Sequence, residues 1–256
     1  MFNDEILEKY INTFLGYGNI NGDICFIGLE EGIGVSGKLL EEKPDLGFKE
    51  VNKKLSTWKT LGESHLVDGK EFHLKTNDLW HKETSAIQKT WEGIIRTILS
   101  YENQDLSHAN ILNFQINRLG RKNENHSLIE LRPLPSKSLR GSEWFYKSFS
   151  KLNYLNTKKN YEDYITNKRI EIIQNFIKLS SFKFIVFLSI GLNFRPYWER
   201  IANSEFKDIK KDFLVCSNNK FFVTHHPTSY PKKEQLISKS LKDVYKDLGQ
   251  YLKSLA

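Results

Sequence analysis

Residues 24–38 read ICFIGLEEGIGVSGK, an apolar run followed by two glutamates and three glycines. The apolar part, 24–29, comes directly after Asn21-Gly22-Asp23, a combination typical of turns. This pattern predicts a short, fully buried β-strand with Glu30 and Glu31 at its carboxyl end. Buried strands of this kind are typical of α/β folds, so the function depends on the residues that follow the strand.

The glycine-rich turn can be interpreted in three ways. The segment 32–38 has the spacing of a P-loop, but Leu39 stands where a Ser or Thr would bind Mg²⁺. The same glycines match the dinucleotide motif G-x-G-x-x-G, yet the two preceding glutamates would repel a pyrophosphate and no clean βαβ unit follows. In the third interpretation, the glutamates are functional carboxylates at a strand end and the glycines form a loose turn.

Three further apolar runs predict strands over Ser127–Leu131, Phe182–Ser189 and Lys220–Thr224. Helical spacing of apolar residues predicts helices over 4–15, 87–99, 161–177 and 237–252. The segment 109–119 fits a helix or a strand, and we expect 38–83 to be an irregular insertion with short helices. Apolar strands separated by helices predict an α/β fold: a single domain over 1–256, built as a three-layer α/β/α sandwich around a mostly parallel four-stranded sheet.

The composition is that of an ordinary globular chain. Of 256 residues, 39% are hydrophobic and 27% charged, and no apolar run approaches the roughly 20 residues of a membrane helix. The first ten residues carry three acids and one lysine, unlike a signal peptide, so we expect a cytoplasmic protein. Cys25 and Cys216 are expected to be small buried residues, and we expect no metal and no cofactor. The net charge of +7 favours polyanionic partners.

Residues suited to chemistry gather where the predicted strands end. Glu30 and Glu31 end the first strand, Glu130 and Arg132 lie at the end of the second, and His225-His226-Pro227 follow the last. In open α/β sheets, sites form at the carboxyl ends of the strands. We therefore expect carboxylates and a histidine to face one crevice.

With these placements, the sequence resembles the uracil-DNA glycosylase superfamily, whose members share a small α/β/α sandwich with a four-stranded parallel sheet. The first motif of that family follows strand one in forms such as G-Q-D-P-Y, G-M-N-P-G or G-E-A-P-G, and GLEEG at 28–32 occupies this place. The second motif centres on His-Pro-Ser, and HPTS at 226–229 occupies it. FIVFLSIG at 184–191 and LIELRPLPSKS at 128–138 resemble the third-strand and second-strand segments.

Some positions depart from the family pattern. Glu31 replaces the proline of the first motif, and Glu30 stands where Asp or Asn activates water. The Asn that reads uracil in some branches is not evident, and Glu130 lies near its place. These departures favour a base other than plain uracil.

The resemblance implies a set of site residues. The catalytic pair would be Glu30, which stabilises the sugar cation and orients water, and His226, which donates to the base carbonyl. Candidates for substrate binding are Gly28, Leu29, Glu31, Gly32, Glu130 and Arg132. Candidates for DNA binding are Gly34, Ser136, Lys137, Ser138, Arg140, Pro227, Thr228, Ser229 and Tyr230. Aromatic residues from the insertion, namely Phe48, Trp58, Phe72 and Trp80, are candidates for stacking on the base.

The resulting hypothesis is a monofunctional DNA N-glycosylase that flips out and excises a modified pyrimidine, such as a hypermodified cytosine of phage DNA, in antiviral defence. Two alternatives stay open: a uracil-DNA glycosylase of base-excision repair, and a non-catalytic DNA-binding module of the same fold. We expect the protein to be a monomer that binds DNA and no membrane. Glu130 carries part of the hypothesis, since a carboxylate accepts hydrogen bonds from a cytosine amino group and repels the O4 carbonyl of uracil.

Overall fold

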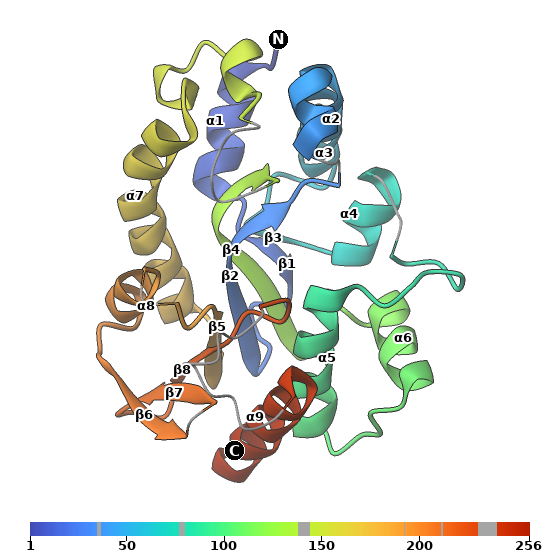
Figure 1. Cartoon of the computed structure of the whole chain (residues 1–256), viewed down its shortest axis with the longest axis vertical. Coiled ribbons are helices and arrows are strands. Elements are labelled where there is room, and N and C mark those ends of the chain that lie inside the picture. Colours follow the sequence, from blue (N-terminus) through green and yellow to red (C-terminus); the bar gives the residue numbers. More distant parts are fainter. Residues whose placement is uncertain (35–36, 77–79, 138–143, 192, 211, 230–239) are drawn as a thin grey trace.

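The computed structural model describes the chain except for residues 35–36, 77–79, 138–143, 192, 211 and 230–239. The described residues contain one eight-stranded sheet in the order β3-β1-β4-β2-β5-β8-β7-β6 (Figure 1). Its strands are β1 (Gly16–Gly18), β2 (Ile24–Gly32), β3 (Leu66–Val67), β4 (His126–Ser136), β5 (Phe184–Leu188), β6 (Phe206–Lys210), β7 (Phe213–Cys216) and β8 (Phe221–Thr224).

The centre of this sheet consists of β4, β2, β5 and β8, which run parallel to one another and correspond to the four predicted strands. The prediction of a four-stranded sheet is wrong in its size. On one side β1 pairs antiparallel with β4, and β3 pairs with β1; on the other, β7 and β6 continue the sheet in antiparallel fashion. Strands β1 and β3 have only three and two residues, too few for a periodic apolar pattern to reveal them.

The helices are α1 (Asp4–Thr13), α2 (Gly37–Glu42), α3 (Pro44–Thr60), α4 (Gly69–Thr76), α5 (Lys89–Tyr101), α6 (His108–Asn117), α7 (Lys158–Leu179), α8 (Arg195–Ala202) and α9 (Leu241–Leu255). The ambiguous segment 109–119 is therefore helical, and Ser107 caps its helix by accepting from the Asn110 backbone N–H.

The expectation that 38–83 is irregular is wrong for a large part of it. Helix α3 alone has 17 residues, and Pro44 lies in its first turn, where a proline starts a helix rather than breaking it. Gly47, inside α3, allows the ring of Phe145 to approach, since a Cβ there would lie 2.6 Å from Phe145 Cε1. Proline and glycine, which suggested a loop here, thus start the helix and allow close packing.

Helices pack on both faces of the central strands, as the continuous apolar runs predicted. Alternate residues of β2 point to opposite faces. Ile24 and Phe26 join a core cluster with α5 and α9, whereas Cys25 and Ile27 join another with α7 and α8. Cys25 and Cys216 are both buried, so the prediction of small buried cysteines is confirmed. In Figure 1, α7 and α8 lie on one side of the sheet and α5, α6 and α9 on the other.

A third core cluster surrounds the β1 edge and is rich in aromatic residues. It joins α1, α3 and α4 to the segment that follows β4, and Tyr10 of α1 stacks on Phe14, directly after that helix, with ring centroids 4.6 Å apart. Trp58 of α3 packs edge-on against Tyr10 and is fully buried. The segment predicted to be an insertion is therefore part of the core. It packs α3 and α4 against α1 and the β1 edge of the sheet.

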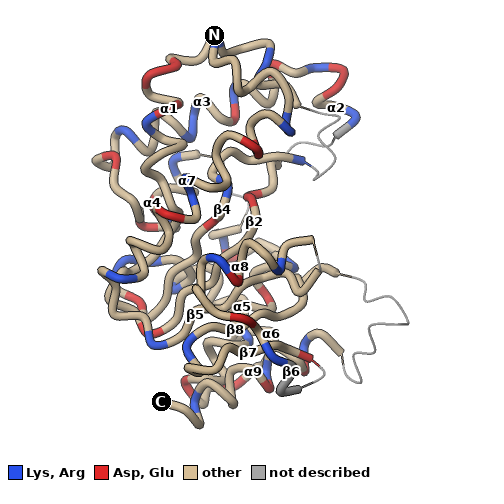
Figure 2. Tube along the Cα trace, turned by 90° about the vertical axis from the view of Figure 1, so that its left-hand side faces the viewer, with Lys and Arg blue, Asp and Glu red and all other residues tan. Residues whose placement is uncertain are grey.

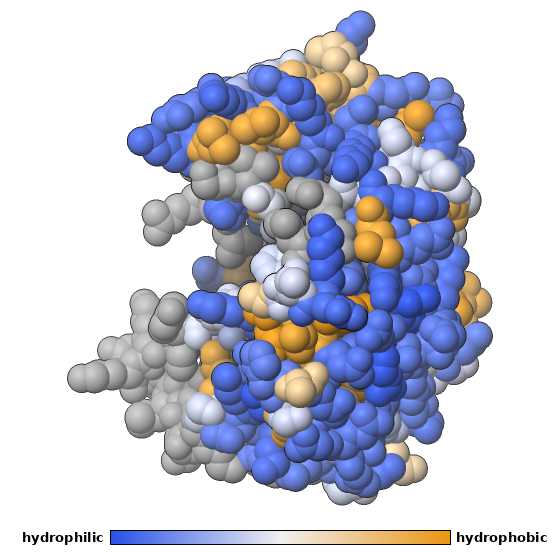
Figure 3. Space-filling view, turned by 90° about the vertical axis from the view of Figure 1, so that its right-hand side faces the viewer, coloured by the Kyte–Doolittle hydropathy of each residue, from blue (hydrophilic) through white to orange (hydrophobic). Residues whose placement is uncertain are grey.

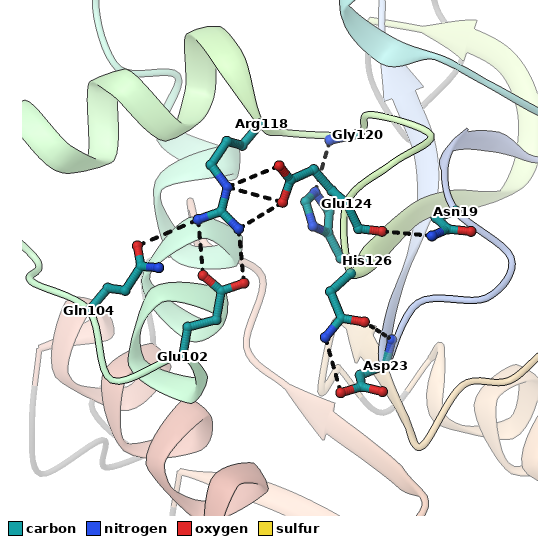
Figure 4. Close-up of polar contacts among 9 residues, drawn as sticks. Asn19, Asp23, Glu102, Gln104, Arg118, Gly120, Glu124 and His126 are labelled. Carbon is teal, nitrogen blue, oxygen red and sulfur yellow. Dashed lines mark hydrogen bonds and ion pairs between the residues drawn. The ribbon is translucent and has the colours of Figure 1, made fainter.

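Charged and polar side chains hold together the amino ends of β2 and β4 (Figure 4). Arg118, directly after α6, makes bidentate contacts to Glu102 at 3.0 Å and to Glu124 at 2.7 to 3.1 Å. The buried His126, at the start of β4, accepts a hydrogen bond from the Gly120 backbone N–H at 2.9 Å. This end of the sheet is closed by paired groups, and the candidate site lies at the opposite end of the same strands.

The surface on the side of α4, α5 and α6 is largely hydrophilic, and the outline of the molecule is indented at mid-height (Figure 3). Among the described residues, none of the helices has the length and apolar character needed to cross a membrane.

Candidate functional site

A cavity of about 310 Å³ lies beside β1, β2 and β4, under α3, α4 and α5, and reaches the carboxyl ends of β2 and β5. Its β4 residues, 128–130, lie in the first half of that strand, so the prediction that Glu130 lies at the end of its strand is wrong. Strands and helices both contribute aromatic and polar residues to the wall of the cavity. The aromatic and imidazole rings that line it are those of Tyr17, Phe26, His73, Trp80 and Trp91. The polar residues that line it include Glu31, Glu50, Lys54, Gln88 and Glu130. A concave, mostly apolar site with a few convergent polar groups is typical of a small-molecule or base-binding site.

Glu31 presents a paired carboxylate to this cavity. Its Oε1 lies 2.7 Å from Nζ of Lys54, and the two side chains are 24% and 12% exposed. The Tyr17 hydroxyl also donates to Glu31, at 3.4 Å from Oε2. Helix α3 brings Lys54 to the end of β2, where it holds Glu31 in place. The sequence analysis did not identify this cation because it expected the segment around Lys54 to be irregular.

Glu130 is the second carboxyl group of the cavity, and it lies directly against Gly28. The two residues are partners in the parallel β2–β4 ladder. A Cβ added to Gly28 would lie 2.3 Å from Glu130 Oε2, so the carboxyl group occupies the space that a side chain at 28 would need. Oε2 is buried and has no hydrogen-bond partner among the described residues, while the residue as a whole is partly exposed to the cavity.

The surroundings of Glu130 favour its neutral form. Burial raises the pKa of this carboxyl group well above its usual range, and the nearby charges of Glu31 and Glu30 raise it further. Lys54 and Arg169 act in the opposite direction but do not outweigh burial. The cavity thus combines an ionic pair, Glu31 with Lys54, and a carboxyl group whose protonated form is favoured.

Glu30, predicted as the catalytic carboxylate, points away from this cavity. Its Oε1 lies 2.6 Å from Nζ of Lys158, at the start of α7, and the two side chains are only 8% and 5% exposed. Burial raises the pKa of Glu30, and the contact with Lys158 offsets part of this rise. Lys158 also donates to Oγ of Ser136 at 2.7 Å.

An irregularity in the strand pairing separates the two glutamates. Simple alternation along β2 would put Gly28 and Glu30 on one face and Glu31 on the other. The register between β2 and β4 shifts after Glu30, where two residues of β2 span four of β4. Beyond this shift, Glu31 and Gly32 line the cavity together with Gly28. Glu30, which lies before the shift, reaches the α7 side.

Of the other predicted substrate-binding residues, two lie outside the cavity. Leu29 packs against the apolar cluster beneath α7 and α8. Arg132 is buried and binds Glu162 at 2.6 Å. The structure therefore brings together Gly28, Glu31, Gly32 and Glu130 from the predicted set, and it separates Leu29 and Arg132 from them.

His226, the second predicted catalytic residue, is partly buried directly after β8 and is not among the residues that line the cavity. Its Nδ1 lies 3.0 Å from the Thr228 hydroxyl, and burial lowers the pKa of its ring. Pro227 packs on α5, since a Cβ on Gly93 would lie 3.1 Å from Pro227 Cβ. The histidine segment thus borders the helix whose first residues line the cavity. The preceding His225 is buried.

The predicted DNA-binding residues are distributed around this edge of the sheet. Gly34 lines the cavity, Lys137 is exposed after β4, Thr228 is exposed, and Oγ of Ser229 is buried. Ser138, Arg140 and Tyr230 lie outside the described residues. In the described part of the chain, Lys and Arg are interspersed with Asp and Glu (Figure 2).

Trp80 is the one of the four proposed stacking residues that lines the cavity. Trp58 and Phe72 are fully buried, and Phe48 packs against the same aromatic core. Trp91 was missed because its place in an amphipathic helix suggested a core residue. Its position in the first turn of that helix, directly after residues 80–88, could have identified it as a residue of the site.

Two buried polar contacts fix the aromatic wall. The side-chain amide of Gln115, on α6, donates to the backbone carbonyls of Trp80 and Ala86 and accepts from the Gln88 N–H. His73 stacks on His81, with ring centroids 5.1 Å apart. Burial and the neighbouring His81 keep the pKa of His73 well below its ordinary value, so this ring is neutral.

Comparison of the chain with protein-family models, with curated proteins and with solved structures gives no match. The case for a function therefore depends on the ordered motifs and on the chemistry of the cavity.

Proposed function

We propose that this protein is a hydrolytic DNA glycosylase that excises a modified pyrimidine. The observation that supports this best is the cavity beside β2 and β4, which combines carboxyl groups, a lysine and aromatic rings. A flipped base needs aromatic faces on which to stack, polar groups that read its edge and a carboxylate near its sugar. The order of the motifs along the four central strands supports the same family of reactions.

The reaction breaks the bond between C1′ of the deoxyribose and the base nitrogen, and the bonding electrons leave with the base. The sugar passes through an oxocarbenium-like state, as in glycoside hydrolysis, and water adds to C1′. A carboxylate close to C1′ stabilises the cation and accepts a proton from the water. A donor at the base carbonyl stabilises the departing anion, and His226 remains our candidate for that role.

Glu31 is better suited than Glu30 to be this carboxylate. Glu31 lines the cavity and is held by Lys54, whereas Glu30 is bound to Lys158 on the α7 side. The assignment of Glu30 came from its place in the motif, and the register shift after it gives the cavity position to its neighbour. We therefore propose Glu31 as the catalytic carboxylate and Glu30 as a residue that anchors the end of β2 to α7.

The size of the cavity supports an enlarged base. Sites that enclose a drug-sized ligand measure about 300 to 1,000 Å³, and this cavity falls at the lower end of that range. A plain pyrimidine ring is smaller than such ligands. The space between the strand ends and the aromatic wall accordingly favours a pyrimidine with a bulky 5-substituent.

The decisive experiment measures base release from three DNAs: a uracil-containing oligonucleotide, unmodified DNA, and viral DNA with glycosylated cytosines. We expect release from the modified DNA, a fall of at least about 100-fold in Glu31→Gln, and near-normal activity in Glu71→Gln, an exposed control on α4. Rapid release of uracil with none from modified DNA would refute the choice of substrate. Loss of activity in Glu30→Gln with full activity in Glu31→Gln would restore the original assignment.

DNA binding should be largely electrostatic and independent of sequence. Lys137, exposed at the end of β4 beside the cavity strands, is expected to contact a phosphate. The slope of log affinity against log salt should fall by about one in Lys137→Ala and should not change in Lys246→Ala, which alters an exposed residue of α9. An affinity that does not respond to salt would contradict this proposal.

A further inference from the structure

We propose that Glu130 binds the substrate as a neutral carboxylic acid and reads a base edge on which a hydrogen-bond donor and an acceptor stand side by side. This inference rests on the proposed glycosylase function and names the residue that selects the base. Its basis is the position of the carboxyl group in the cavity, the atoms that surround it, and the groups that face it.

The backbone dictates where this carboxyl group lies. Glu130 and Gly28 face each other across the β2–β4 ladder, and the missing side chain of Gly28 leaves the space that the carboxyl group fills. One oxygen, Oε2, is buried without a hydrogen-bond partner among the described residues. A buried carboxyl oxygen with no donor and no cation beside it is more stable protonated than charged. The residue as a whole is partly exposed and lines the cavity, where a ligand can reach it.

The charged groups around Glu130 do not provide it with a cation of its own. Lys54, on α3, is bound to Glu31, and Arg169, on α7, donates to the backbone carbonyls of Leu131, Glu130 and Ile11. The other titratable groups of the described residues that act on it or line its cavity are Glu30 and Glu31 of β2, Glu50 of α3, Tyr17 of β1 and His73 of α4. Glu30 and Glu31 repel a charge on Glu130, and none of these groups supplies a cation.

A neutral carboxyl group offers what a carboxylate does not. It carries an O–H donor next to a carbonyl acceptor, whereas the ionised form only accepts. Such a pair complements N3 and the amino group of cytosine, and equally O4 and N3–H of uracil. The sequence-based argument that Glu130 repels uracil assumed an ionised group. In its neutral form Glu130 selects a pyrimidine edge, and the rest of the cavity must distinguish the substituents.

Substitution by glutamine tests this inference, because a glutamine amide keeps one donor beside one acceptor and never ionises. With the DNA that the wild-type protein cleaves, Glu130→Gln should keep kcat/KM within a few-fold. Glu130→Ala should lose about 10- to 100-fold, the discrimination of one bidentate contact to a base. Inactive Glu130→Gln with folded protein would overturn the inference, because it would mean that the carboxylate itself is required.

The pH dependence of kcat/KM provides a second test. Between about pH 5 and about pH 9, kcat/KM of the wild-type protein should fall on the alkaline side, and kcat/KM of Glu130→Gln should not. There the wild-type value should fall about tenfold for each pH unit above the pKa of Glu130. A wild-type activity that instead rises with pH relative to Glu130→Gln would assign activity to the ionised form and overturn the inference.

A spectroscopic measurement separates failure of this inference from failure of the proposed function. The infrared difference between the wild-type protein and Glu130→Gln at neutral pH should contain the carbonyl stretch of a protonated carboxyl group, with no DNA present. Absence of that band overturns the inference even if the protein is an active glycosylase. Presence of the band with no base release from any DNA keeps the neutral Glu130 and refutes the glycosylase.

Discussion

Replacing Lys158 by methionine should destabilise the protein strongly, because it leaves the Glu30 carboxylate buried without its cation. Nζ of Lys158 lies 2.6 Å from Glu30 Oε1, and the two side chains are 5% and 8% exposed. Oε2 of Glu30 already has no hydrogen-bond partner among the described residues. Removing one partner of a buried ion pair costs about 3 to 5 kcal/mol. For a chain of this size that corresponds to a fall in Tm of about 6 to 20 °C.

The double variant Lys158→Met/Glu30→Gln should recover most of the lost stability. It replaces the pair by two uncharged side chains of similar size, and such replacements of buried pairs are often close to neutral. The coupling energy between the two positions should then be about 2 to 4 kcal/mol. Lys159→Met is the matched control, since Lys159 is the next residue of α7 and its side chain is 81% exposed; we expect little change there.

The pH dependence of this loss has a defined sign. The pKa of Glu30 in the folded protein is raised above its usual value, so the folded state favours the protonated form, and stability falls as the pH rises from the unfolded to the folded pKa. Without Lys158 this pKa rises further. Lys158→Met should therefore lose less stability near pH 5 than near pH 8.

Urea unfolding of the wild-type protein, Lys158→Met, Glu30→Gln, the double variant and Lys159→Met at both pH values, analysed by linear extrapolation, measures these quantities. A loss in Lys158→Met no larger than that in Lys159→Met, or a loss that does not change with pH, would refute the reasoning. The same preparations serve the activity assay. If Glu30 only anchors β2, the double variant should keep base release while Glu31→Gln loses it.

Two further predictions concern packing and charge away from the cavity. Gly249→Ala should destabilise the fold by about 1 to 3 kcal/mol in urea unfolding, although alanine has the higher helix propensity. The new Cβ would lie 2.3 Å from the Thr97 carbonyl oxygen, where α9 crosses α5. An unchanged unfolding midpoint would contradict that close contact. Arg118→Ala should lower the free energy of unfolding by about 1.5 to 3 kcal/mol. The control Lys75→Ala, which removes an exposed ion pair, should lower it by at most about 0.5 kcal/mol. Equal effects would show that the Arg118 contacts are not fixed.

The four central strands and the main helices could be predicted from the sequence because their signals are local. A strand that is buried on both faces must be apolar at every position, as FIVFL in β5 is, and a helix with one buried face shows its 3.6-residue period, as α5 does. The edge strands carry no such signal. In β1, Gly16 and Gly18 adopt positive φ and approach the backbone of β4, which is a tertiary contact and not a local preference.

The sequence by itself determined that carboxyl groups of two parallel strands would lie near one another, because the apolar pattern locates both strands; Glu31 does lie at the end of β2, but Glu130 lies in the first half of β4. Only the tertiary structure decided which of them meet. Glu30 is bound to Lys158 of α7, whereas Glu31, beyond the register shift, lines the cavity. Helix α3 brings Lys54 to Glu31 from a distant part of the chain. The protonation of Glu130 was equally a tertiary matter, since burial and neighbouring charges, not residue type, set a pKa.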